Sequence, residues 1–132
     1  MLTVTVNTSP QAGDLEFDVV ALSGVDPNSP LDAVVTTTGV SANSGSVSVA
    51  SSQAGDYFVG VMSTNSASSA VNLTSAAPWV QRDIDPNNVV AQAGQVADLT
   101  TFPPAGSQTW NFSWTTPADT WVAGVAAFKA AP

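Results

Sequence analysis

The hydrophobic and polar residues of this 132-residue chain alternate with a period of two rather than 3.6, which indicates β-strands and not helices. This alternation predicts half-buried strands over 2–7, 15–22, 46–49 and 109–114. Each of these segments places apolar side chains on one face and polar side chains on the other, as expected for a sheet that covers a core.

Other segments are apolar on both faces. Residues 57–62 and 120–129 read as interior strands, and strands over 79–84 and 89–93 are predicted on either side of the turn signal Asp85-Pro86-Asn87-Asn88. A further strand is expected over 95–101. With turn residues recurring every 8 to 12 positions and no helical stripe, the chain is predicted to be all-β. We expect a single antiparallel β-sandwich domain over residues 1–132, jelly-roll-like in topology.

Two stretches of the chain repeat one turn motif. Ser9-Pro10-Gln11-Ala12-Gly13-Asp14 and Ser51-Ser52-Gln53-Ala54-Gly55-Asp56 each lead into an apolar strand. Glycine accepts a positive φ, and the Asp side chain can accept hydrogen bonds from loose backbone N–H groups before the strand begins. The motifs are therefore interpreted as equivalent turns that precede strands.

Charge and composition exclude several classes of protein. Ten acidic residues against Lys129 and Arg82 give a net charge of -8, which is unsuited to a nucleic-acid-binding surface. The chain has no Cys and no His, so disulfides, zinc sites and His-based triads are excluded.

One loop has the residue types of a metal site. Asp83, Asp85 and Asn87 place oxygen ligands at alternate positions, which matches the preference of Ca²⁺ for oxygen. The loop departs from a calcium-binding loop because Asn88 stands at the turn glycine and Gly94 at the bidentate glutamate. The acidic loop 26–32 could contribute a ligand, and a simple Asp-Pro-Asn turn is the alternative. No other cofactor is expected.

Catalytic groups are not evident in the sequence. Glu16 and Asp18 share a strand face, but they lack basic partners and read as a solvated or edge-protecting face. The Ser and Thr residues are not placed in a nucleophile motif or beside a plausible base. We expect no enzymatic activity.

The aromatic residues allow two interpretations. Trp110, Phe112 and Trp114 share one face of a strand whose other face is polar, so core packing is favoured. The alternative is a flat platform of exposed rings that stacks on sugars or on a partner protein.

Several motifs resemble a known type of domain. Residues 18–26, the segment 29–33, Ala54-Gly55-Asp56 before an apolar strand, and the ending 120–129 occur in the order seen in β-sandwich domains of bacterial surface and secreted proteins and of phage structural proteins. The resemblance implies a β-sandwich with a structural or adhesive role, and it transfers no catalytic residues. Such domains have more strands before residues 23–26 than the one predicted here, so the chain is either a compact version or is completed by a neighbouring chain.

Two functions remain open from the sequence. The first is a structural, non-enzymatic protein of a virion, such as a capsid decoration or tail protein, that forms a homo-oligomer or joins a larger assembly; few Lys or Pro residues protect its strand edges. The alternative is an extracellular module that binds a carbohydrate or a cell surface. No nucleic-acid partner is expected.

The expected location is the virion or the extracellular space. The N-terminus has neither the basic nor the apolar region of a signal peptide. The longest stretch without strongly polar side chains, 121–128, is eight residues, whereas a helical membrane span needs roughly 20. No membrane span is expected.

Overall fold

Two antiparallel sheets pack against each other in the computed structural model, which describes residues 5, 19–64, 74–85, 93–99, 103–115 and 118–132. The strands of the described residues are β1 (Leu31–Ala42), β2 (Ser44–Ser51), β3 (Tyr57–Thr64), β4 (Thr74–Ser75), β5 (Trp79–Asp85), β6 (Ala93–Leu99), β7 (Gly106–Ser113) and β8 (Asp119–Phe128). One sheet has the order β1-β8-β3-β6-β5 and the other β2-β7-β4. The prediction of an all-β sandwich is confirmed.

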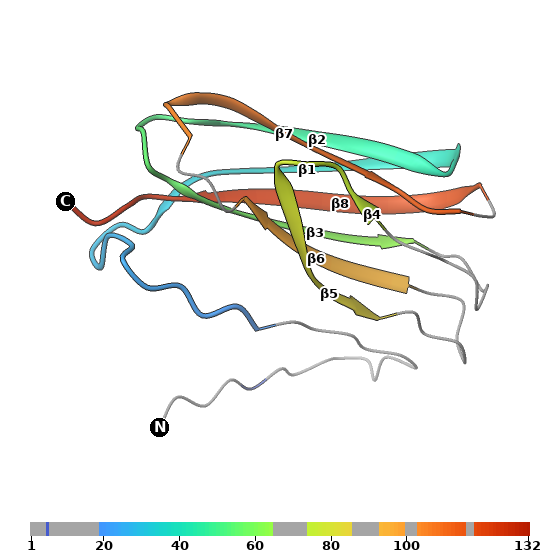
Figure 1. Ribbon diagram of the computed structural model, residues 1–132, viewed down its shortest axis with the longest axis horizontal. Helices are drawn as coiled ribbons and strands as arrows, with labels where there is room; N and C mark the ends of the chain where they lie inside the picture. The colour runs from blue at the N-terminus through green and yellow to red at the C-terminus, as the bar shows by residue number, and fades with distance from the viewer. Residues whose placement is uncertain (1–4, 6–18, 65–73, 86–92, 100–102, 116–117) are drawn as a thin grey trace.

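The strand pairs show how the chain folds over on itself. β1 pairs with β8, β2 with β7 and β3 with β6, so the two halves of the chain pair in nested order and the pairs alternate between the sheets. This nesting resembles that of a jelly roll, except that β5 joins the larger sheet beside β6 and does not pair with β4. Figure 1 shows β2 and β7 above the larger sheet, which extends from β1 down to β5.

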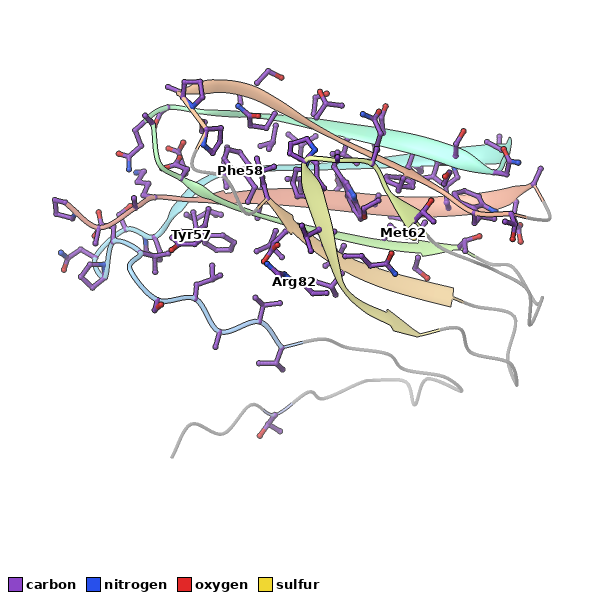
Figure 2. The ribbon with its side chains drawn as sticks, viewed as in Figure 1. Tyr57, Phe58, Met62 and Arg82 are labelled. Atoms are coloured by element: carbon purple, nitrogen blue, oxygen red, sulfur yellow. The ribbon has the colours of Figure 1, made fainter. Side chains whose placement is uncertain are left out.

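The core lies between the two sheets and is built by period-two alternation. In β2 the side chains of Val47 and Val49 are buried, and in β8 every second residue from Trp121 to Ala127 is buried. Figure 2 shows Tyr57 and Phe58 on opposite sides of β3, with Phe58 in the core. The predicted interior strands over 57–62 and 120–129 are confirmed, because β3 lies between β8 and β6 and β8 between β1 and β3.

The N-terminal half differs from the sequence prediction. A strand was predicted over 15–22, but residues 19–22 form no strand, so the prediction is wrong for them. Residues 15–18 lie outside the described residues, as does the strand predicted over 2–7 apart from residue 5. The sequence analysis also missed β1, a 12-residue edge strand. Val34 and Val40 are exposed on its outer face, whereas its inward face carries Ala33, Val35, Thr37 and Gly39, so the two faces differ too little in hydrophobicity to predict a strand.

The strands predicted over 46–49, 79–84, 95–101 and 109–114 are confirmed with shifted ends. β5 extends to Asp85, one residue beyond the predicted segment, and β6 begins at Ala93 rather than at Gln95. Residues 89–92 and 100–101 lie outside the described residues, so the separate strand predicted over 89–93 stays a prediction, and Ala93 belongs to β6. That residues 1–132 form one domain stays a prediction.

Candidate functional site

The aromatic residues form a continuous row in the core. Successive ring centroids from Phe58 through Trp79, Trp110 and Phe112 to Trp121 lie 6.5, 5.7, 4.8 and 5.1 Å apart. All four tryptophans are buried. The core interpretation of the tryptophans and of Phe112 is confirmed, and these rings are not a platform for stacking on sugars.

Two buried indole N–H groups are tied to the smaller sheet. The Nε1–H of Trp110 donates to Ser75 Oγ at 3.0 Å, and that of Trp79 donates to the Thr109 carbonyl at 2.9 Å. A buried indole N–H without a partner costs free energy, so these bonds fix the rings in place. The Trp110 bond also fixes β4, a strand of only two residues, against β7.

The predicted calcium ligands lie at the end of β5. The backbones of Asp83 and Asp85 belong to this strand and pair with Val96 and Gly94 of β6, while Asn87 lies outside the described residues. Among the described residues no group of three or more acidic side chains is placed to hold a metal ion. Calcium binding stays a prediction.

Asp32 and Asp56 form a carboxyl pair that the sequence analysis did not identify. Asp32 is the second residue of β1. Its carboxylate accepts hydrogen bonds from the backbone N–H of Ser52 at 2.5 Å and from Ser52 Oγ at 2.6 Å. Asp56 is only 1% exposed, and its Oδ1 accepts a 3.4 Å hydrogen bond from the Ala130 N–H. The two carboxyl groups interact with each other electrostatically.

The environments of the two carboxyls separate their titrations. Burial raises the pKa of Asp56 above 3.8, and the neighbouring Asp32 carboxyl raises it further. The hydrogen bonds from Ser52 lower the pKa of Asp32 below 3.8. Asp56 Oδ2 is buried and has no hydrogen-bond partner, which adds to the cost of ionising this carboxyl. The hydrogen bonds from Ser52 to Asp32 tie the start of β1 to the turn before β3.

This pair confirms part of the predicted turn chemistry. Gly55 has a φ of 86°, and Asp56 accepts a backbone hydrogen bond, as expected for the Ala-Gly-Asp motif. The donor is Ala130, which is 74 residues away, and not a local N–H. The corresponding motif at 12–14 lies outside the described residues, as do Glu16 and Asp18.

The outward side of the larger sheet carries an uncharged surface, here called the valine face. Its three cross-strand rows on β1, β8 and β3 are Val34–Ala126–Val59, Thr36–Gly124–Val61 and Thr38–Val122–Ser63. Val34, Val61 and Val122 are 58%, 48% and 49% exposed. Toward β5 the surface becomes charged at the ion pair between Arg82 and Asp98, whose nitrogen and oxygen lie 2.8 Å apart.

The outward side of the smaller sheet is polar and hollowed. A hollow of about 480 Å³ is lined by Ser44, Gly45, Ser46, Thr74, Ser75, Ala76, Asn111, Phe112 and Ser113. None of these residues is charged. The three strands that line it come from distant parts of the chain, so sequence reasoning had no local signal for this hollow.

Comparison with protein-family models, with curated proteins and with solved structures finds no match to this chain. The part of the chain that the structure describes contains no helix of the length and hydrophobicity needed to cross a bilayer. The function must therefore be argued from these surfaces themselves.

Proposed function

We propose that this chain is a non-enzymatic structural subunit that associates with further copies of itself in a larger assembly, such as the capsid or tail of a virion. The observation that carries the proposal is the valine face. Burying exposed apolar surface stabilises association by about 25 cal/mol per Å². None of the nine residues of this face is charged, so association buries no charged group and incurs no cost for desolvating one.

The edge strand β1 supports the same proposal. Among the described residues β1 pairs with β8 on one side only. From Ala33 to Ala42 it contains neither a charged residue nor a proline, which are the usual means of blocking edge-to-edge pairing. Main-chain pairing along β1 would continue the larger sheet from one copy into the next.

The size of the valine face indicates a contact that gains strength from repetition. With strands about 4.8 Å apart and a rise of about 3.4 Å per residue, the face measures roughly 15 by 17 Å. This is smaller than the ~800 Å² that each partner buries in a standard interface. Such a contact is weak in a pair and becomes strong when many copies associate.

Jelly rolls build both viral capsids and lectins, so the fold is compatible with this role but does not decide it. The chain would then be located in the virion. In the alternative role of an extracellular binding module, ligand binding would need a surface other than the buried aromatic row.

The test is the molar mass of the full chain by light scattering over a concentration series. Wild-type protein should exceed the monomer mass of 13.3 kDa as concentration rises. Added salt should strengthen association, because it screens repulsion between copies of net charge -8. Electron microscopy of the associated material should show particles or tubes of regular subunits.

A pair of matched variants locates the contact. The double variant Val34→Lys, Val122→Lys places two charges on the valine face and should remain monomeric. Ser48→Lys, Ser107→Lys adds the same charge to exposed positions of the smaller sheet and should associate like the wild type. The proposal is contradicted if the wild-type chain stays monomeric at concentrations on the order of 1 mM. Its free energy of association would then be weaker than about 4 kcal/mol.

A further inference from the structure

The hollow on the smaller sheet has a regular arrangement of polar groups. One cross-strand row joins the side chains of Ser44, Ser113 and Thr74, and the next outward row joins Ser46 and Asn111. The spacing of a sheet places neighbours in a row about 4.8 Å apart and successive outward rows about 7 Å apart. All five side chains are exposed.

The walls of this hollow are held in place by the core. Phe112 packs between the rings of Trp110 and Trp121, which fixes the middle of β7. On the other wall, Ser75 accepts the Trp110 indole N–H, and the Ala76 N–H donates to the Asn111 carbonyl at 2.9 Å. The hydroxyls of Thr74 and Ser113 lie 2.9 Å apart and hydrogen-bond to each other. The polar groups are thus positioned before any ligand binds, which lowers the entropic cost of binding.

The chemistry of the lining restricts the ligand. Each hydroxyl offers a donor and acceptor sites, and the Asn111 amide offers two donors and an acceptor. The nine lining residues carry no charge, and the chain as a whole has a net charge of -8, so anionic ligands are disfavoured. A neutral molecule with many hydroxyl groups satisfies such a surface, and a volume of about 480 Å³ lies in the range of ligand sites.

We infer that this hollow binds a neutral oligosaccharide segment. The hollow lies on the outward side of the smaller sheet, whereas the valine face lies on the outward side of the larger sheet, at the opposite surface of the sandwich. A subunit that associates through one surface therefore leaves the other open, and an assembly presents many copies of a weak site. The inference does not depend on the proposed assembly role.

The experiment combines a glycan array with chemical-shift mapping on the ¹⁵N-labelled full chain. At least one neutral oligosaccharide of hexoses or N-acetylhexosamines should bind, with a Kd on the order of 1 mM or below. Its addition should shift the side-chain amide signals of Asn111 and the backbone signals of residues 74–76. Sialylated and sulfated glycans should not bind.

Variants assign the binding to the hollow. Asn111→Ala and Ser46→Ala remove exposed polar groups and should each weaken binding at least about fivefold. Ser48→Ala is the matched control, because Ser48 is exposed on the same strand face outside the hollow, and it should bind like the wild type.

Three results would overturn the inference: no neutral glycan binds, only anionic glycans bind, or Asn111→Ala and Ser46→Ala bind unchanged. The molar mass of Asn111→Ala should equal that of the wild type at every concentration. A failure of glycan binding is thereby distinguished from a failure of self-association.

Discussion

Trp110 occupies the space that a side chain at Gly60 would fill. A Cβ atom on Gly60 would stand 2.6 Å from Cε3 of the Trp110 indole. Trp110 is fully buried and packs against Trp79 and Phe112, so it has little room to move away. This close approach between β3 and β7 sets how tightly the two sheets pack in the middle of the sandwich.

Gly60→Ala should lower the free energy of unfolding by about 1–3 kcal/mol, because the added methyl overpacks a core that cannot adjust cheaply. Urea denaturation of the wild type and the variant measures the difference. Gly124→Ala is the control, since the nearest atom to its Cβ would be the Thr36 methyl at 3.3 Å on the outward face. An equal loss in both variants would show that backbone effects, and not the indole, determine the cost.

Ser75→Ala should destabilise the protein by about 1–3 kcal/mol, because the buried Nε1–H of Trp110 loses its acceptor. The measurement is the denaturation midpoint, followed by tryptophan fluorescence. Thr74→Ala removes an adjacent hydroxyl that bonds only at the surface, and it should change stability by no more than about 0.5 kcal/mol. If both variants have wild-type midpoints, the indole bond does not anchor β4.

The Asp32–Asp56 pair should give stability a specific pH dependence. Asp56 has a raised pKa, so its contribution is present at low pH and is lost as the pH rises through its folded pKa, above 3.8. Asp32 has a lowered pKa, so its contribution is present above 3.8 and is lost as the pH falls through its folded pKa. The pair stabilises the fold most between these two folded pKa values.

Asp56→Asn tests this pH dependence. An Asn side chain can donate to Asp32 and accept from Ala130 at any pH, as the protonated acid does. The stability difference between variant and wild type should therefore grow in favour of the variant as the pH rises above 3.8 and through the folded pKa of Asp56. Denaturation curves at several pH values measure it. A difference that is constant with pH would mean that Asp56 is ionised throughout.

The tryptophans should be shielded from solvent. All four are at most 8% exposed, so acrylamide should quench the fluorescence of the native chain far less than that of the chain in denaturant. Iodide, which does not enter the core, should have still less effect. Strong quenching of the native protein would indicate an exposed ring and would restore the stacking platform as a candidate.

Sequence reasoning identified the elements whose pattern is decided by the core. The alternation in β7, with Trp110 and Phe112 inward, and the double-sided apolar character of β3 and β8 follow directly from burial on one or both faces. β1 was missed for the opposite reason. Its exposed valines and its small inward residues at Ala33 and Gly39 leave no contrast between the faces, because Trp121 fills the space at Gly39.

The surfaces were less accessible to sequence reasoning than the fold. The hollow needs Ser46, Thr74 and Asn111 side by side, and the carboxyl pair needs Asp32 beside Asp56. Neither set is close in sequence, and a single sequence contains no signal for which strands pair. The calcium ligands were proposed from local spacing alone, and their grouping stays a prediction.

The sequence by itself determined the class of fold and the excluded chemistry. Period-two patterning, the absence of Cys and His and the net charge of -8 are properties of the chain that no packing can alter. Only the tertiary structure decided which uncharged residues form the valine face and which form the hollow, and that the Asp56 carboxyl is buried near Asp32. These depend on the nested pairing of strands far apart in the chain, which results from burying one core shared by all of them.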